Sequence, residues 1–367
     1  MRRLSLLAFL ILSPGLHTEP AIAQSTPATK PSQRKMPPGF VTKSLKMETG
    51  QEYKYAVFVP PQVEIAKDHQ WPLIVFLHGS GESGEDGIRQ TTVGLPQYIS
   101  TRPTKFPFIV LMPQAHATWF RGQEALMVWK MLAVTRQEFQ VDPDRIYLTG
   151  LSMGGFGTWE LAMAQPDVFA AMVPVCGAAP KDYLGNVSQI PIWAFHGAQD
   201  RNVPVAGSRE AIKELKRLGG VYPKYTEYPD VGHECWDRAY SDPELWKWLR
   251  AQRRKAPRVI DYRLPAGIAR IWWLVVKSDE KIKGDAHIRA SIDDKGLITV
   301  ETEGVESWGL LSDTEPLKPG MDITVTWNGA AMYRGTFKGS LTFKPMTEQE
   351  KAEAAKKGAP TAANGKK

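Results

Sequence analysis

The chain has 367 residues, which is enough for more than one domain and for a large buried core. Hydrophobic residues make up 43% of it and charged residues 23%, a balance that excludes a chain disordered throughout. Its two cysteines are too few for a disulfide framework or a cysteine zinc cage. The net charge of +7 is a small excess, part of which lies at the chain ends, so we expect no nucleic-acid partner.

The N-terminus has the pattern of a cleaved leader. Two arginines are followed by a nine-residue apolar run, Leu4–Leu12, and by the small-residue sequence Ala21-Ile22-Ala23. This predicts a signal peptide over residues 1–23 and a flexible leader over 24–38. Because a membrane span needs about 20 apolar residues, we expect an exported protein, periplasmic or extracellular, with no stable span after cleavage.

Residues 39–256 alternate between strand and helix patterns. Short apolar runs that end in Gly or Pro are typical of parallel strands covered on both faces. Strands are predicted at 53–59, 73–77, 108–112, 145–149, 170–176, 190–195 and 224–228. Helical spacing of apolar residues predicts helices at 124–139, 154–164, 205–218 and 243–253. We therefore expect an α/β fold with a doubly wound, mostly parallel sheet, in which ligands bind at the carboxyl ends of the strands.

Beyond Pro257 the periodicity changes. Alternating or β-branched segments are separated by turn signals such as Pro319-Gly320 and Asn328-Gly329. The predicted strands are 258–264, 270–277, 287–292, 297–303 and 322–327. We expect a small all-β domain at residues 258–345, followed by a disordered tail at 346–367 that is rich in Ala, Lys and Gly.

A candidate nucleophile follows the predicted strand at 145–149. The sequence there is Gly150-Leu-Ser-Met-Gly154, and a helix pattern comes next. G-x-S-x-G between a strand and a helix is typical of a nucleophile elbow, a tight turn that raises the serine hydroxyl above the sheet edge. The motif also occurs by chance, and a Gly/Ser turn without chemistry needs no partners. The assignment of Ser152 therefore depends on a base and an acid elsewhere in the chain.

Residues suited to these roles follow the last two strands of the alternating region. One strand precedes His196-Gly-Ala-Gln-Asp200, and the next precedes Pro229-Asp-Val-Gly-His233. Parallel strands end at the same sheet edge, so we expect Ser152, Asp200 and His233 to meet there. Their chain order is that of an α/β-hydrolase triad, with His233 as base and Asp200 as the acid that orients it.

Other residues compete for the same roles. His116 lies in a loop that reaches toward the same edge and is the main rival base, and Asp182 is the alternative acid. His78 and His196 each precede a glycine at a strand end, a position that more often shapes a turn than supplies a base. Asp230, three residues from His233, is better suited to a turn or a cap.

Attack by a serine creates an oxyanion that needs hydrogen-bond donors already in place. The backbone N–H of Met153, next after the candidate nucleophile, is the first predicted donor. The second is the N–H of Ser80 in the loop His78-Gly-Ser-Gly81, which follows the first buried strand. This loop lacks a phosphate-binding motif, and the chain has no dinucleotide-binding or zinc-protease motif, so we expect neither a cofactor nor a metal.

Four segments together resemble secreted bacterial α/β-hydrolase esterases of the feruloyl-esterase-like and polyhydroxybutyrate-depolymerase-like group, a phospholipase/carboxylesterase or prolyl-oligopeptidase-like family. They are 77–82 (LHGSGE), 142–159 (DPDRIYLTGLSMGGFGTW), 195–200 (FHGAQD) and 228–236 (YPDVGHECW). The resemblance covers about residues 50–253 and implies an α/β-hydrolase fold with Ser152, Asp200 and His233 as its triad. The β domain lies outside it.

Several features bear on the substrate. Residues 177–189 are too few for the helical cap that many such hydrolases carry, which predicts an open cleft suited to a bulky or polymer-attached ester. Trp119, Trp236 and His78 are candidate lining residues, because aromatic surfaces stack on sugars and aromatic acyl groups. Cys176 and Cys235 flank the loops of the predicted site, as two buried thiols or as a disulfide.

The favoured hypothesis is a secreted serine carboxylic-ester hydrolase that acts through an acyl-enzyme on bulky esters, such as acetyl or feruloyl esters of a plant or microbial polysaccharide. A serine peptidase of the prolyl-oligopeptidase type would use the same triad. A third hypothesis is a glycan-binding protein with an inert hydrolase fold. Its binding surface would come from tryptophans of the β domain, namely Trp272, Trp273, Trp308 and Trp327.

Overall fold

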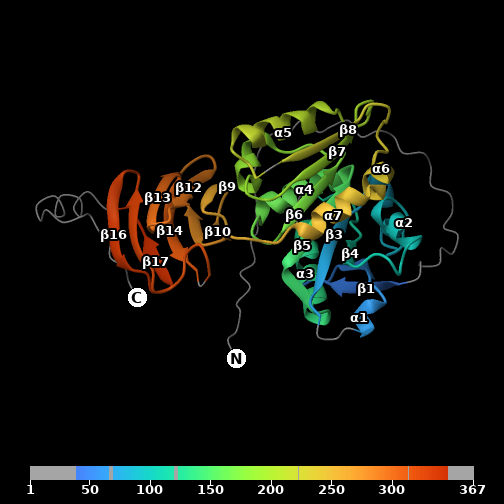
Figure 1. Cartoon of the computed structure of the whole chain (residues 1–367), viewed down its shortest axis with the longest axis horizontal. Helices are drawn as coiled ribbons and strands as arrows, with labels where there is room; N and C mark the ends of the chain where they lie inside the picture. The colour runs from blue at the N-terminus through green and yellow to red at the C-terminus, as the bar shows by residue number, and fades with distance from the viewer. Residues whose placement is uncertain (1–38, 66–68, 120–122, 222, 313, 346–367) are drawn as a thin grey trace, which may run out of the picture. The chain divides into compact units, whose positions relative to one another are not determined.

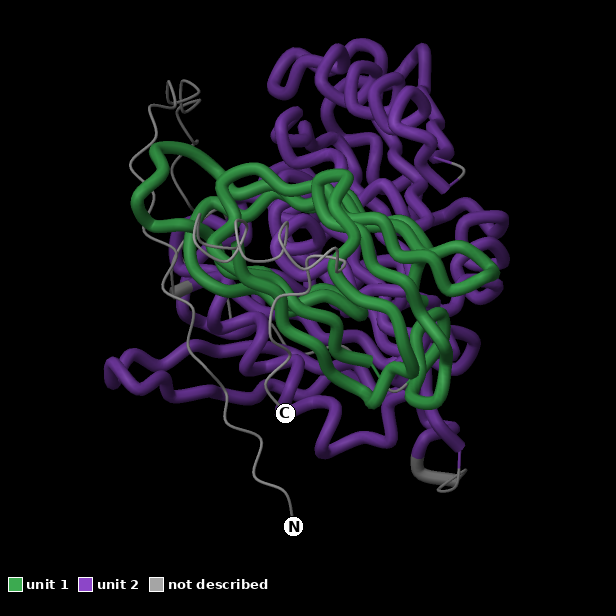
Figure 2. The backbone as a smooth tube through the Cα atoms, turned by 90° about the vertical axis from the view of Figure 1, so that its left-hand side faces the viewer, with its two compact units in different colours: residues 1–18, 256–367 green, residues 19–255 purple. Residues whose placement is uncertain are grey.

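The computed structural model describes residues 39–65, 69–119, 123–221, 223–312 and 314–345. The predicted signal peptide, leader and C-terminal tail lie outside these residues. The described residues fall into two compact units: the first along the chain runs up to Lys255 and is purple in Figure 2, and the second runs from Ala256 onward and is green. Within them, no helix has the length and apolar character needed to cross a bilayer.

The first unit is built on an eight-stranded sheet in the order β1-β2-β4-β3-β5-β6-β7-β8 (Figure 1). The six strands from β4 to β8 in this order run parallel, and β1 and β2 pair antiparallel at one edge. The strands are β1 (Phe40–Lys46), β2 (Glu52–Phe58), β3 (Trp71–Leu77), β4 (Ile109–Pro113), β5 (Val141–Leu151), β6 (Ala171–Val175), β7 (Trp193–Gly197) and β8 (Lys224–Tyr228).

Helices connect these strands and cover both faces of the sheet. The α-helices are α1 (Gln62–Ile65), α2 (Leu95–Ser100), α3 (Gln123–Glu138), α4 (Met153–Ala164), α5 (Ala206–Arg217), α6 (Trp236–Ser241) and α7 (Pro243–Ala251). Three 3-10 helices lie in the loops: η1 (Ser80–Glu82), η2 (Arg89–Thr91) and η3 (Lys181–Val187).

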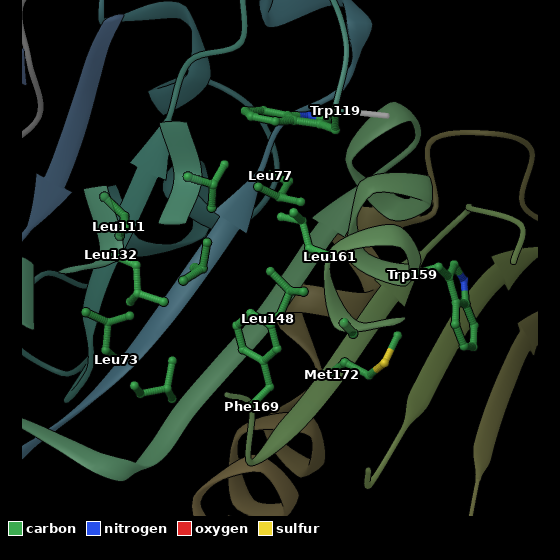
Figure 3. Close-up of a cluster of buried hydrophobic side chains, with 14 of the residues drawn as sticks. Leu73, Leu77, Leu111, Trp119, Leu132, Leu148, Trp159, Leu161, Phe169 and Met172 are labelled. Carbon is green, nitrogen blue, oxygen red and sulfur yellow. The ribbon is translucent and has the colours of Figure 1, made fainter. Parts of the chain in front are cut away.

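Two hydrophobic cores form because successive strand residues point to opposite faces. In β3, Leu73, Val75 and Leu77 belong to a cluster that also includes residues of α3, α4 and α5. Leu73 and Leu77 are labelled in Figure 3. Ile74 and Phe76 of the same strand pack with α2, α6 and α7 on the other face. All seven β3 residues are buried, as expected for a central strand covered on both sides. This architecture confirms the predicted α/β class, with a doubly wound, mostly parallel sheet.

The second unit consists of two β-sheets around a core of its own. One sheet has four strands in the order β10-β11-β14-β17, and the other has five in the order β16-β15-β13-β12-β9. The strands are β9 (Val259–Leu264), β10 (Ile268–Ile271), β11 (Leu274–Ser278), β12 (Ala286–Ile292), β13 (Leu297–Glu303), β14 (Val305–Leu311), β15 (Asp322–Trp327), β16 (Ala330–Thr336) and β17 (Ser340–Phe343). The expectation of further β structure at the C-terminus is confirmed.

The tryptophans of this unit correct two expectations. The strand predicted at 270–277 is broken, because Trp272 and Trp273 form the turn of a two-residue hairpin between β10 and β11, with Trp272 at φ 55°. Trp273 and Trp308 are each 1% exposed and Trp327 is 8% exposed. Trp308 stacks on Phe343 and meets Trp327 edge to face. Three of the four tryptophans proposed for glycan binding are therefore core residues, since a ring enclosed by protein offers no face to a sugar.

Candidate functional site

Ser152 occupies the turn between β5 and α4. Its φ of 54° is rare for a residue with a side chain and marks a tight strand-to-helix turn. The turn requires the glycines of the motif, because a larger residue would collide with the backbone. A Cβ on Gly150 would lie 2.3 Å from the carbonyl oxygen of Gly154. A Cβ on Gly154 would lie 2.0 Å from that of Leu77, at the end of the neighbouring strand β3. The motif glycines are therefore required by close backbone approach.

The three residues predicted to meet at the sheet edge do meet. His233 Nε2 lies 2.8 Å from Ser152 Oγ, and His233 Nδ1 lies 2.7 Å from Asp200 Oδ2. Ser152 follows β5, Asp200 follows β7 and His233 follows β8, so the ends of three parallel strands bring together residues up to 81 positions apart. The arrangement allows the imidazole to accept the serine proton while a carboxylate fixes its other nitrogen.

Asp200 is held by four donors. Its Oδ1 accepts the N–H groups of Asn202 and Val203, each at 2.8 Å. Its Oδ2 faces two imidazoles, His233 Nδ1 and His196 Nε2, the latter at 3.1 Å. The carboxylate side chain is fully buried, whereas the His233 ring is 15% exposed. A buried carboxylate with its acceptor positions occupied stays in one orientation.

The rival residues lie elsewhere. His116 stacks on Tyr53, and its Nδ1 is 2.9 Å from Gln51 Nε2. Asp182 is exposed in the first turn of η3, and Asp230 is exposed and pairs with Arg238 at 2.8 Å. Asp200 is the acid that contacts His233 in this structure.

The two predicted oxyanion donors begin helical segments. Met153 is the first residue of α4 and Ser80 the first of η1, and the leading N–H groups of a helix lack intrahelical acceptors. The loop of Ser80 lies close to the nucleophile, since a Cβ on Gly79 would be 3.6 Å from Ser152 Cβ. Gly79 itself donates its N–H to Glu82 Oε2 at 3.0 Å. Burial raises the pKa of Glu82 to about 7, so this loop contains a carboxyl group that titrates near neutrality.

His78 and Trp119 do not line the site as expected. His78 is 1% exposed, accepts the Ala115 N–H at 3.0 Å and donates from Nδ1 to the Gly79 carbonyl at 2.6 Å. Burial lowers its pKa to about 4, which keeps the ring neutral. Trp119 is also 1% exposed and donates its indole N–H to the His78 carbonyl at 2.8 Å. In Figure 3 it lies beyond Leu77 at the end of β3. Both side chains join the loops after β3 and β4 and offer no surface to a substrate.

Trp236 and the two cysteines lie beside the triad. Trp236 is 9% exposed, and its ring meets the His233 ring edge to face, with centroids 5.5 Å apart. Cys176 and Cys235 are buried free thiols in mutual hydrogen-bond contact. The Cys176 thiol also accepts the Ser152 N–H at 3.3 Å. Sequence patterns did not reveal this contact or the one between His196 and Asp200, because each depends on how strand ends pack.

One set of donor atoms is close enough to be considered for a metal. Among the described residues, Cys176, Asp200 and His233 place ligand atoms within 4.8 Å of one another. The Asp200 and His233 atoms already hydrogen-bond to each other. Burial raises the pKa of the Cys176 thiol well above its usual range, which favours the neutral thiol, a poor metal ligand. The donor chemistry therefore fits a hydrogen-bonded triad better than a metal centre.

The family model for phospholipases and carboxylesterases matches residues 60–243, which is half of the chain. The chain belongs to the phospholipase/carboxylesterase family. The matched range includes Ser80, Ser152, Asp200 and His233. The family membership implied by the sequence motifs is thereby confirmed.

Individual relatives include a depolymerase and a feruloyl esterase. Poly(3-hydroxyalkanoate) depolymerase C of Paucimonas lemoignei is 28% identical over 209 residues, covering 44% of this chain and 47% of the depolymerase. Feruloyl esterase B of Thermothelomyces thermophilus is 30% identical over 213 residues, covering 45% of this chain and 70% of that protein. The solved structure of a thermostable esterase matches 60% of this chain and 64% of its own, with a TM-score of 0.53 and 34% identity. The chain thus spans about half the length of the depolymerase that it matches.

Proposed function

We propose that this protein is a serine carboxylic-ester hydrolase with Ser152 as nucleophile, His233 as general base and Asp200 as orienting acid. The observation that carries the proposal is the continuous hydrogen-bond chain from Ser152 Oγ through the His233 ring to Asp200, at 2.8 and 2.7 Å. Membership in the phospholipase/carboxylesterase family supports the same reaction class.

The mechanism follows from these contacts. His233 Nε2 takes the Ser152 proton as the oxygen attacks the ester carbonyl, and Asp200 stabilises the imidazolium that forms. The N–H groups of Met153 and Ser80 receive the negative charge on the carbonyl oxygen, aided by the positive end of the α4 dipole at Ser152. Collapse of this intermediate expels the alcohol, which takes its proton from His233, and leaves an acyl-enzyme. Water, deprotonated by His233, then releases the acid and restores Ser152.

For the substrate we propose bulky or polysaccharide-linked esters of the acetyl or feruloyl type. The names of relatives support this class, since they include a feruloyl esterase, a probable acetylxylan esterase and a polyester depolymerase. Residues 177–189, all described, contain the short 3-10 helix η3 where a helical cap would be inserted. Export by the predicted signal peptide at residues 1–23 belongs to the same proposal, because polymeric substrates of this kind lie outside the cell.

The test is Ser152→Ala assayed on p-nitrophenyl acetate and on acetyl, feruloyl and 3-hydroxybutyrate esters, with aminoacyl-proline amides in parallel. We expect loss of about 10⁴-fold or more in kcat on every ester, with circular dichroism unchanged, because loss of the nucleophile leaves only binding and the oxyanion donors. Undiminished ester turnover would contradict the assignment of Ser152. Wild-type cleavage of the amides in preference to all esters would favour a peptidase.

A further inference from the structure

His196 makes a contact for which the proposed mechanism has no assigned role. It lies near the end of β7, four residues before Asp200, and its side chain is fully buried. Its Nε2 is 3.1 Å from Asp200 Oδ2 and 3.0 Å from the Val203 carbonyl oxygen. On the other side of the ring, Nδ1 is 2.8 Å from the Ser208 hydroxyl of α5. The Asp200 carboxylate oxygen that faces His233 therefore faces a second imidazole as well.

The partners determine which nitrogen carries the proton. The Asp200 carboxylate and the Val203 carbonyl can only accept, so Nε2 of His196 must be the protonated nitrogen. The Ser208 hydroxyl lies between His196 Nδ1, at 2.8 Å, and the Gly177 carbonyl oxygen, at 3.1 Å, so its single proton is shared between these two acceptors. Burial lowers the pKa of His196, which keeps the ring neutral. His196 is therefore a fixed, uncharged N–H donor to Asp200.

The charged and titratable groups around His196 are few. Asp200 and His233 face it at the site, and Glu227 pairs with it across the β7–β8 ladder. The Glu227 carboxylate is bound by Arg209 at 2.5 and 2.8 Å, so its charge is already balanced by a guanidinium. Asp200 is the remaining carboxylate to which His196 donates.

We infer that His196 is a positioning residue of the site: its Nε2–H fixes the Asp200 carboxylate and shares the negative charge on Oδ2 between two imidazoles. This inference rests on the proposed triad. Two consequences follow for the reaction. The carboxylate keeps the orientation that aligns His233 with Ser152, and His233 faces less negative charge than an Asp200 without the second donor would present.

The test compares kcat/KM against pH for His196→Leu and His196→Gln on p-nitrophenyl acetate. Leu removes the donor, whereas Gln offers an N–H close to the position of Nε2. Without the donor, Asp200 stabilises the His233 imidazolium more strongly, so the acid limb of the profile should move up by about half a pH unit or more. We expect His196→Leu to lower kcat about 10- to 100-fold with KM within about 2-fold, and His196→Gln to recover most of both losses.

The control is another histidine that contacts a carboxylate. His287 Nε2 lies 2.7 Å from Asp261 Oδ1 in the second unit, and His287→Gln should leave kcat and the profile unchanged. If His196→Leu does not fold, Ser208→Ala provides the test. This variant removes the hydroxyl that contacts His196 Nδ1 without opening a large cavity. It should lower kcat about 2- to 5-fold and move the acid limb in the same direction.

A wild-type acid limb in both His196→Leu and Ser208→Ala would overturn the inference, since loss of a purely structural histidine would change stability and leave the pH profile of kcat/KM unchanged. An intact profile in Ser208→Ala alone overturns it if the leucine variant does not fold. A wrong triad assignment would give a different result, namely a Ser152→Ala variant that keeps its activity. An inactive Ser152→Ala together with unchanged His196 and Ser208 profiles would leave the triad standing and remove only the role of His196.

Discussion

At Ser152 the backbone adopts φ 54° and ψ −118°, a conformation that costs a residue with a side chain about 1–3 kcal/mol. Its surroundings hold it there: the Ser152 N–H donates to the Val175 carbonyl at 3.0 Å and contacts the Cys176 thiol at 3.3 Å. The sequence could predict Ser152 as the nucleophile, because the tight turn between strand and helix requires glycines on either side of the serine for steric reasons. It could not predict the roles of His78 and Trp119, which depend on how the loops after β3 and β4 pack against each other.

Trp119 provides a test at this scale. Because its ring is enclosed and its N–H is bonded, Trp119→Ala should lower the free energy of unfolding by about 3–5 kcal/mol, measured by denaturant titration. Turnover by the folded fraction should change by the same factor for acetyl and feruloyl esters. A selective loss on feruloyl esters at unchanged stability would instead indicate a stacking surface for the substrate.

At the scale of elements, the 3-10 helix η1 contains both the proposed oxyanion donor Ser80 and the titratable residue Glu82. Glu82 accepts the Gly79 N–H one residue before Ser80, and burial raises its pKa to about 7 from 4.5. At a pH between 4.5 and about 7, the Glu82 carboxyl is protonated in the folded chain and ionised in the unfolded chain. Stability from this group is thus complete below about pH 4.5 and is lost as the pH rises through 7.

Glu82→Gln removes this titration and keeps an oxygen to accept the Gly79 N–H. The two proteins should have equal unfolding free energies near pH 4.5, and the variant should be more stable by about 1–2 kcal/mol at pH 8. Denaturant unfolding at a series of pH values measures the difference, with Glu52→Gln in the exposed part of β2 as the control. If the unfolding free energies of wild type and Glu82→Gln changed in parallel with pH, the raised pKa of Glu82 would be contradicted.

The elements themselves were predictable where one pattern dominates. Buried central strands such as β3 are unbroken apolar runs, and their ends place the predicted triad at one edge. The edge strand β1 was not predicted, because its burial pattern is largely exposed and gives little periodic signal. The hairpin at Trp272-Trp273 was missed because aromatic residues favour strands, whereas here the register pairs Ile271 with Leu274 and leaves the two tryptophans as the turn.

On the scale of the whole molecule, each unit has its own hydrophobic core. The two clusters on the faces of the eight-stranded sheet lie within residues 40–249, and the third lies within 260–343. The residues of the proposed site all belong to the first unit. A unit with its own core and a complete site has what it needs to fold and react without the other.

A chain that ends at Lys255 should therefore keep kcat/KM on p-nitrophenyl acetate within about 2-fold of the full-length value. Circular dichroism and a cooperative thermal transition would establish that the shortened chain is folded. A folded chain with more than about a 10-fold loss would show that the β unit contributes to catalysis, contrary to this expectation.

Covalent trapping tests the central claim most directly. A fluorophosphonate ester reacts with an activated serine, and its adduct is located by peptide mass spectrometry. The account predicts one phosphonyl group per chain on Ser152, loss of ester hydrolysis in proportion to labelling, and no adduct in Ser152→Ala. Full inactivation with the adduct on any other residue, or persistent hydrolysis by a chain fully labelled at Ser152, would contradict it.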